Sequence, residues 1–143
     1  MNKTQSAGYL SNHLARLFAL LLHNALKPLG VSPAYMPILL ELWQADHLSQ
    51  QDLVVRCDLS QATVANTLSR MERDGLIQRL PHPQDARSRI IQTTQKANNL
   101  RPKIKKIANK INNESLSVLS GDERALFFSL ITKVIEQQKK MLA

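Results

Sequence analysis

The hydrophobic residues of this chain recur every three or four positions in several separate stretches, a spacing that predicts a mostly helical protein. The first stretch covers residues 6–27 and ends before Pro28 and Gly30. A second helix is expected after Ser32, which can cap it, because Pro33 suits the first helical position. The apolar face of this second helix is predicted to contain Met36, Leu39, Leu40 and Trp43.

Two short helix patterns follow each other directly in the middle of the chain. Ser49 opens a third helix with Asp52 at the capping-box position, and Ser60 caps a fourth. Gly75 ends the fourth helix, because glycine readily adopts the left-handed conformation found after a helix. A strand, a turn and a returning strand are then predicted at residues 76–80, 81–85 and 89–93.

Two further helices are predicted in the last third of the chain. One starts near Thr94, and the other covers residues 120–141 with Ser120 and Glu123 as its capping box. Pro102 lies within the first of these helices, where its missing N–H either kinks the helix or delays its start. The residues alone do not choose between these alternatives.

Two adjacent helices, a glycine stop and a hairpin are typical of a winged helix-turn-helix. The predicted fold class is therefore mainly α with a small β-hairpin wing. Residues 1–143 would form a single protomer, in which 33–93 are the DNA-binding winged helix-turn-helix part and 6–27 and 94–143 are dimerisation helices. The terminal helices carry more apolar surface than the central part can cover, which favours a two-fold homodimer. The alternative is a monomer whose terminal helices cover each other.

The charge balance points to a polyanionic partner. The chain has 19 Lys and Arg against 11 Asp and Glu, a formal charge of +8, and nucleic acid is the obvious candidate. No apolar run approaches the roughly 20 residues that a membrane-spanning helix requires. We therefore expect a cytoplasmic protein that does not contact membranes.

The sequence offers little that resembles catalytic chemistry. Cys57 is the only cysteine, so no intrachain disulfide can form, and its place in the third helix favours a buried, small hydrophobic side chain over a redox switch. No Cys/His cluster, glycine-rich phosphate loop or nucleophile–base pair is found in the sequence. We therefore expect no enzymatic activity, no cofactor and no metal site.

Short polar side chains gather in the first half of the fourth helix, the part of a recognition helix that enters the major groove. Gln61 and Asn66 can bond adenine bidentately, and Ala62 or Thr63 can contact a thymine methyl group. A solvated polar face is the alternative for any one of them. The full set predicted to contact DNA is Ser60, Gln61, Ala62, Thr63, Asn66, Thr67 and Arg70, with Arg70 meeting a phosphate or a guanine edge.

Two other segments are predicted to contact the DNA backbone or the minor groove. Ser49 and Gln50 open the third helix, where backbone N–H groups and the helix dipole favour phosphate. Arg87 and Arg89 lie on the wing, and an arginine gains from the negative potential of a narrow minor groove. Asp85 is expected to hold the hairpin, or to orient Arg87, through a charge-assisted hydrogen bond, and an Asx-turn is a compatible alternative.

The segment RMERDGLIQR, followed by PQDARSRIIQTT, resembles the MarR family of bacterial transcriptional regulators. The wing of that family reads roughly D-R-R-x-(K/R), then apolar residues, then L-T at the start of the next helix. Two positions depart from this pattern: Ala86 removes a wing cation, and Thr93 replaces a leucine that would seat the wing on the core. The positions that match are Asp85, Arg87, Ser88, Arg89, Ile90, Ile91 and Thr94.

The resemblance implies a homodimeric repressor that binds an inverted-repeat operator in double-stranded DNA and is released by a small aromatic or phenolic ligand. It also implies a ligand cleft, whose candidate residues are His13, Arg16, Tyr35, Met36 and Trp43. Peroxide-sensing relatives carry a cysteine near the first helix, and this chain has none there. The alternative functions are a winged-helix module controlled by a protein partner and an architectural DNA-binding protein.

Overall fold

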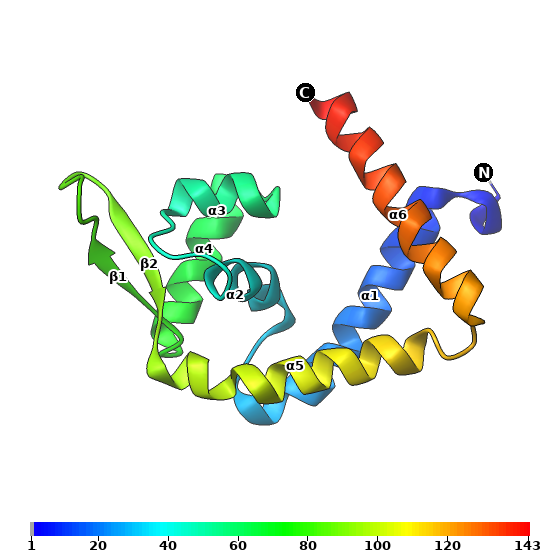
Figure 1. Cartoon of the computed structure of the whole chain (residues 1–143), viewed down its shortest axis with the longest axis horizontal. Coiled ribbons are helices and arrows are strands. Elements are labelled where there is room, and N and C mark those ends of the chain that lie inside the picture. Colours follow the sequence, from blue (N-terminus) through cyan, green and yellow to red (C-terminus); the bar gives the residue numbers. More distant parts are fainter. Residues whose placement is uncertain (1) are drawn as a thin grey trace. The chain divides into compact units, whose positions relative to one another are not determined.

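A computed structural model describes residues 2–143 of the chain, which divide into two compact units. One unit ends at Ile107, and the other comprises Ala108–Ala143. The α-helices are α1 (Ala7–Leu26), α2 (Met36–Leu42), α3 (Gln50–Cys57), α4 (Gln61–Arg73), α5 (Gln95–Ser115) and α6 (Gly121–Leu142) (Figure 1). Short 3₁₀ turns occupy Lys3–Gln5, Lys27–Leu29 and Pro33–Tyr35, and the strands are β1 (Ile77–Pro81) and β2 (Arg89–Thr93).

Helices α3, α4 and α6 begin at the serine caps that the sequence predicts, whereas Pro33 opens a 3₁₀ turn and α2 begins only at Met36. A serine hydroxyl accepts a backbone N–H three residues on at the start of α1, α3, α4 and α6. The predicted capping boxes of Ser49 with Asp52 and of Ser120 with Glu123 are both confirmed. Gly75 follows α4 with φ of 76°, a conformation that strains any residue with a side chain.

The core of the first unit lies beneath the winged helix-turn-helix. Leu53 of α3 and Leu68 of α4 are fully buried there, together with Tyr35. The predicted face of α2 is corrected, because Leu40 is 42 % exposed while Ile38 and Leu42 are buried. The core cluster contains Leu26, Val31, Tyr35, Ile38, Leu39, Leu42, Leu48, Leu53, Val64, Leu68, Met71, Leu76, Ile77, Ile91, Ala97 and Ile104.

The hairpin is anchored to the segment that precedes α3. Strands β1 and β2 pair antiparallel from Ile77 opposite Thr93 to Pro81 opposite Arg89. The Ile91 N–H donates to the Leu48 carbonyl at 2.8 Å, so the base of the wing is bonded to the entry of α3. The wing and the two helices of the helix-turn-helix are therefore one packed assembly (Figure 1).

The structure resolves the question about Pro102. Helix α5 begins at Gln95 and continues through Pro102 to Ser115, so the proline does not delay its start. Pro102 has no N–H to donate to the carbonyl four residues earlier, which weakens the helix locally.

The terminal helices each expose apolar side chains. On α1 these include Leu10, Leu14, Leu17, Leu20 and Leu21. On α6 they include Leu126, Leu130, Ile131, Val134 and Ile135. Within residues 2–143, no single helix is long and apolar enough to cross a membrane, and only Ala7–Leu29 with Pro33–Leu42, bent by 97°, meets that test as a pair.

Candidate nucleic-acid interface

The first half of α4 presents a row of exposed polar side chains. Ser60 caps the helix by accepting the Thr63 N–H at 3.1 Å, and its hydroxyl also donates to the Thr63 hydroxyl. Gln61 is exposed and donates to the side-chain carbonyl of Gln51 on α3. Ala62, Thr63 and Asn66 are exposed as well, so this part of the predicted set can reach a partner.

The structure removes Thr67 from the predicted DNA-contacting set. Its side chain is only 6 % exposed, and its hydroxyl donates to the Thr63 carbonyl at 2.7 Å. Thr67 lies on the same side of the helix as the buried Val64 and Leu68. A hydroxyl already satisfied inside the helix is a packing group, which corrects the prediction.

Arg70, predicted to meet a phosphate or a guanine edge, is exposed in the second half of α4. Its guanidinium lies over the Tyr35 ring, 5.5 Å from the centroid. Arg70 is nine residues after Gln61, about 14 Å along the helix at 1.5 Å per residue. The Arg70 side chain therefore lies in the C-terminal half of α4, away from the row of exposed polar side chains at the N-terminus of the helix.

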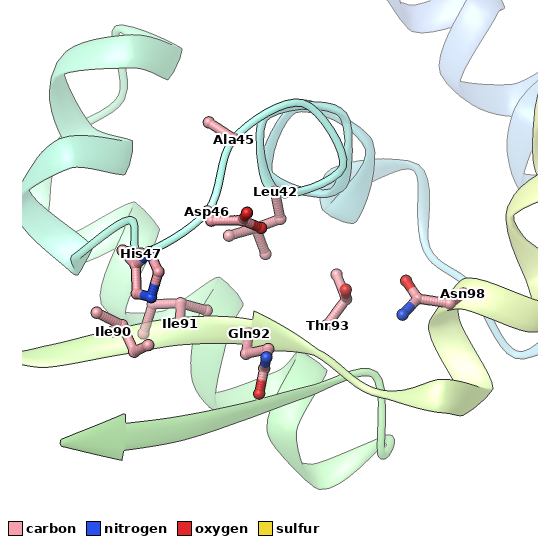
Figure 2. A pocket seen from close by; sticks show the side chains of 9 residues that line it. All are labelled: Leu42, Ala45, Asp46, His47, Ile90, Ile91, Gln92, Thr93 and Asn98. Carbon is pink, nitrogen blue, oxygen red and sulfur yellow. The ribbon is translucent and has the colours of Figure 1, made fainter. Parts of the chain in front are cut away.

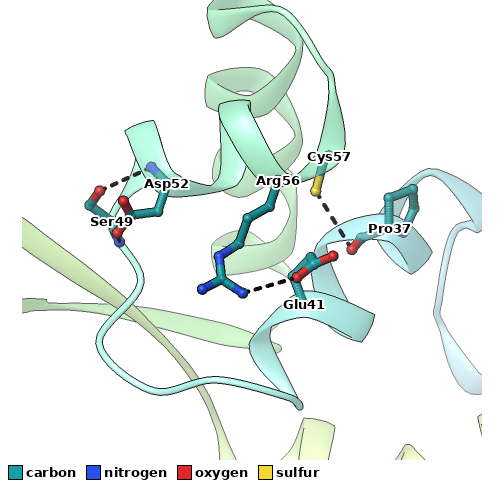
Figure 3. Close-up of polar contacts among 6 residues, drawn as sticks. All are labelled: Pro37, Glu41, Ser49, Asp52, Arg56 and Cys57. Carbon is teal, nitrogen blue, oxygen red and sulfur yellow. Dashed lines mark hydrogen bonds and ion pairs between the residues drawn. The ribbon is translucent and has the colours of Figure 1, made fainter. Parts of the chain in front are cut away.

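The start of α3 retains the geometry expected of a phosphate contact. Ser49 and Asp52 exchange two hydrogen bonds, with Asp52 N–H to Ser49 Oγ at 3.1 Å and Ser49 N–H to Asp52 Oδ2 at 2.9 Å (Figure 3). The Ser49 hydroxyl keeps its hydrogen for an acceptor such as a phosphate oxygen. Gln50 follows at the first helical position and is half-buried.

The tip of the wing is an Asx-turn. Asp85 Oδ1 accepts the Arg87 backbone N–H at 3.0 Å, and the Asp85 carbonyl accepts the Ser88 N–H at 3.1 Å. The Asx-turn, predicted as a compatible alternative for Asp85, is therefore present and holds the hairpin. The Arg87 and Arg89 side chains are exposed.

Arg79 is a wing residue that the sequence did not single out. Its Nε lies 3.7 Å from Glu72 Oε2, which joins β1 to α4 across the packed assembly. The two residues are seven positions apart on different elements, so only the fold brings them together. This ion pair helps to set the wing relative to the recognition helix.

The five residues predicted to line a ligand cleft lie on α1, on the turn before α2 and at the two ends of α2. His13 and Arg16 are exposed on α1, and Met36 packs against the core. Trp43 donates its indole N–H to Asn98 Oδ1 at 3.2 Å, with Arg101 over its ring. Of these five residues, Tyr35 lines a cavity, and the other residues of that lining were not predicted from the sequence.

Tyr35 and Asp74 form a polar contact between segments 39 residues apart. The Tyr35 hydroxyl donates to Asp74 Oδ2 at 2.5 Å, and Arg73 Nε donates to Asp74 Oδ1 at 3.1 Å. The hydrogen bond from Tyr35 has the largest effect on Asp74, and together with the one from Arg73 it lowers the pKa of the Asp74 carboxyl. Burial and the Asp74 carboxylate raise the pKa of the Tyr35 phenol. Lys96 Nζ also donates to the Asp74 carbonyl at 2.8 Å, so the end of α4 is held by several elements.

Replacing Tyr35 by phenylalanine should lower the free energy of unfolding by roughly 1–2 kcal/mol at pH 7, because a hydrogen bond to a charged group is lost. The pKa of Asp74 is lowered in the folded protein, so its contribution to the free energy of unfolding is complete above pH 3.8, the ordinary pKa. That contribution is lost as the pH falls through the lower pKa of the folded state. Tyr35 has a raised pKa, so its contribution is full below 10.0 and is lost at higher pH. Urea unfolding at pH 7 and at pH 3 should show the difference between wild type and Tyr35→Phe shrinking at pH 3. Tyr9→Phe, on the exposed face of α1, should leave the free energy of unfolding unchanged at both pH values. Equal effects of Tyr35→Phe and Tyr9→Phe would contradict a stabilising hydrogen bond from Tyr35 to Asp74.

A second cavity, of about 350 Å³, lies between the end of α2 and the wing (Figure 2). Asp46 and His47 line it from the loop after α2, and Gln92 and Thr93 line it from β2. His47 has φ of 61°, an uncommon conformation for a residue with a side chain. The lining is polar and contains none of the five residues predicted to bind a ligand.

Cys57 is half-buried beside α2 rather than in a reactive setting. Its Sγ lies 3.7 Å from the Pro37 carbonyl (Figure 3). Burial raises the pKa of the Cys57 thiol, and Glu41 and Asp58 raise it further. Because the thiolate is the nucleophilic form, this setting supports the packing role predicted for the cysteine. Nearby, Arg56 and Glu41 form an ion pair at 3.4 Å between α3 and α2.

The chain shares sequence and fold with known regulators. Residues 31–88 match the MarR family model, a segment from the connection between α1 and α2 to the wing tip. The HTH-type transcriptional regulator YdgJ of Bacillus subtilis (strain 168), itself uncharacterized, is 27 % identical over 105 residues. That alignment covers 73 % of this chain and 64 % of YdgJ, slightly less than two thirds of its length.

Two solved structures match almost the whole chain. The PcaV transcriptional regulator from Streptomyces coelicolor, in complex with its natural ligand, has a TM-score of 0.83 at 27 % identity and covers 95 % of this chain and 96 % of its own. The transcriptional repressor CouR, bound to a 23-mer DNA duplex, has a TM-score of 0.83 at 21 % identity, with 92 % and 94 % covered, and shows the shared fold. The chain is thus similar to the MarR family model over residues 31–88, and it shares the fold of a MarR-like regulator along nine-tenths of its length.

Proposed function

We propose that this chain is a sequence-specific DNA-binding transcriptional regulator that acts as a homodimer, and that it is a repressor released by a small aromatic or phenolic effector. The observation that carries the proposal is the exposed polar row at the start of α4 beside a wing with two exposed arginines. A recognition helix presents its N-terminal residues to base edges, while cations and helix N-termini hold the phosphates. The match of residues 31–88 to the MarR family model and the charge of +8 support the same function.

Sequence reading is assigned to α4. Gln61 and Asn66 would pair with adenine, while Ala62 and Thr63 would contact thymine methyl groups. Ser60, Ser49 and Gln50 would meet phosphates at the two helix starts. Arg87 would enter the minor groove from the wing, and Arg89 would hold the flanking backbone.

Dimerisation is assigned to residues 6–27 and 94–143, and DNA binding to residues 33–93. The exposed leucines of α1 and the exposed apolar residues of α6 are unusual for a monomer in water. A second copy would bury them around a two-fold axis. Two recognition helices would then read two half-sites, which accounts for an inverted-repeat operator.

Selection of binding sites from random double-stranded DNA tests the function. The purified protein should enrich a two-fold repeat whose half-sites lie about one helical turn apart, or a multiple of it. Affinity for that site should fall steeply as salt rises, because phosphate contacts release counterions. Gln61→Ala with Asn66→Ala should lose the sequence preference and retain salt-dependent binding to any duplex. Recovery of random sequences by the wild-type protein would reject sequence-specific regulation and leave an architectural role.

Arg87→Ala should weaken operator binding by about tenfold or more, because each wing of the dimer loses a charge-assisted contact. The slope of log affinity against log salt should also become shallower, because the dimer loses two cations that displace counterions from the DNA. Fluorescence anisotropy with the selected site at several salt concentrations measures both.

The wing offers a variant of opposite sign as a control. Ala86→Arg restores a wing cation and should tighten binding, whereas Lys103→Ala, an exposed cation on α5, should leave the affinity unchanged. Circular dichroism should show that all three variants are folded. An Arg87→Ala dimer that bound the operator as tightly as wild type would show that the wing does not contact DNA.

A further inference from the structure

The polar cavity between the loop after α2 and the wing has no part in the DNA-binding function proposed above. We propose that it binds a small organic cation that carries an ammonium group and, a few bonds away, a neutral oxygen acceptor, as an amino alcohol does. Its volume of about 350 Å³ lies within the range of about 300–1,000 Å³ that is typical of small-molecule sites. The lining residues are Leu42, Ala45, Asp46, His47, Ile90, Ile91, Gln92, Thr93 and Asn98.

Three polar side chains from three different elements converge on this cavity. Asp46 comes from the loop after α2, Thr93 from the end of β2 and Asn98 from the start of α5. Figure 2 shows the polar ends of these three side chains directed toward the space between them. Leu42 and Ile91 are buried and give the same cavity an apolar wall. An apolar wall with a few converging polar groups is the usual form of a small-molecule site.

The negative charge of the cavity is not balanced by the protein. Asp46 is the one carboxylate in the lining, and the lining contains no Lys or Arg. The ion pairs formed within residues 2–143 all use other acids, so Asp46 has no cationic partner although the chain carries a charge of +8. An ammonium ion would provide that partner through a charge-assisted hydrogen bond, and another of its N–H groups would reach the Thr93 hydroxyl.

The amide of Asn98 defines the other end of the ligand. The Trp43 indole N–H donates to Asn98 Oδ1 at 3.2 Å, which turns the carbonyl oxygen of the amide toward the tryptophan. The Asn98 NH₂ group is then free to donate into the cavity. A donor in the lining requires an acceptor in the ligand. Because no cation of the lining accompanies Asn98, a neutral hydroxyl or carbonyl oxygen suits it better than a carboxylate.

Other classes of ligand fit the lining less well. A phosphate group, from DNA or free in solution, would be repelled by the Asp46 carboxylate and would find no Lys or Arg in the lining. A metal ion needs several ligating groups, and the described part of the chain has no cluster of three or more His, Cys, Asp or Glu residues that could hold one. A small organic cation is therefore the class that the lining favours.

Titration of the full-length protein with ethanolamine tests the site at constant pH and constant ionic strength. Trp43 is the only tryptophan of the chain, so its fluorescence and the NMR signal of its indole N–H report on the contact with Asn98. Ethanolamine should give a saturable change in both signals. Ethylene glycol lacks the charge and ethylamine lacks the oxygen, so each should bind about tenfold more weakly or less, the loss expected for one strong contact. The titration uses no DNA, so its outcome does not depend on the proposed function.

Variants of the lining locate the binding within the molecule. Asp46→Asn should weaken ethanolamine binding by about tenfold or more, and Thr93→Val should weaken it severalfold. Asp122→Asn removes an exposed carboxylate of α6 and should leave binding unchanged. No saturable response to ethanolamine, or equal binding by wild type and Asp46→Asn, would overturn the proposal. Equal binding of ethylene glycol, or a response to inorganic phosphate in place of ethanolamine, would overturn the assignment to a cation.

Discussion

A Val134→Glu variant should be monomeric and should bind its operator at least about a hundredfold more weakly than wild type, because a monomer reads only one half-site. Val134 is 54 % exposed in the middle of α6, with Leu130 and Ile131 one turn before it. If a second copy covers this face, the new carboxylate must enter an apolar contact, where an unpaired charge costs several kcal/mol. Sedimentation equilibrium measures the oligomeric state, and fluorescence anisotropy measures operator binding.

Ser129→Glu is the matched control for the dimer prediction. It adds the same charge to the same helix, but Ser129 lies about 140° around the axis from Val134 at 3.6 residues per turn. This variant should remain dimeric and should bind DNA like wild type. A Val134→Glu protein that is folded, dimeric and fully active would show that the apolar face of α6 does not form the dimer.

Leu68→Ala should lower the free energy of unfolding by about 2–5 kcal/mol, the range for truncating a fully buried leucine. Leu68 has no exposed surface and lies on the core side of α4, in the same cluster as Leu53 of α3. Truncating Leu68 leaves a cavity directly under the recognition helix. The free energy of unfolding therefore falls by more than it would for a substitution at the surface. Urea unfolding followed by circular dichroism gives the value.

The neighbouring Ser69→Ala separates this effect from changes in helix propensity. Ser69 is exposed on the same helix, and surface changes of this kind are usually within about 0.5 kcal/mol. Below the unfolding transition, Leu68→Ala should still bind the operator, because its side chain is not on the exposed row. A loss under about 1 kcal/mol would mean that the packing around Leu68 is looser than the structure shows.

Local signals predicted most of the fold. The serine caps, the two capping boxes and Gly75 place helix starts and stops through contacts within a few residues, so the sequence contains all of the needed information. The hairpin was predicted from strand-forming residues on either side of a turn. Asp85 holds that turn through the predicted Asx-turn. The wing resembles that of the MarR family, and residues 31–88 match the model of the same family.

Predictions that depended on which way a helix faces succeeded less often. In α2 the pattern of apolar residues admits two faces, and the structure buries Ile38 and Leu42 while it exposes Leu40. In α4 a threonine suits either a base contact or a helix interior, and the burial of Thr67 decides for the interior. Only the positions of the neighbouring elements settle such choices.

The polar contacts that tie distant segments together were beyond the reach of sequence patterns. Tyr35 and Asp74 meet across 39 residues, and no local spacing announces that pairing. The ligand cleft was predicted by resemblance from α1 and α2, whereas the cavity that contains Tyr35 also involves Arg70 and Arg73 of α4. The base-contacting residues remain a proposal, because a solvated polar row and a DNA-reading row have the same composition.

Because Asp74 is held in place, α4 can act as a lever that pivots at its C-terminal end. Tyr35 and Lys96 fasten one end of the helix, and Gln61 stands about 20 Å away at the other, at 1.5 Å per residue. Over that length, a rotation of about 5° at the fastened end moves the far end by nearly 2 Å, more than the tolerance of a hydrogen bond. A displacement too small to break any contact at the pivot would therefore be enough to misalign the base-reading side chains, and in a dimer the error would occur at both half-sites together.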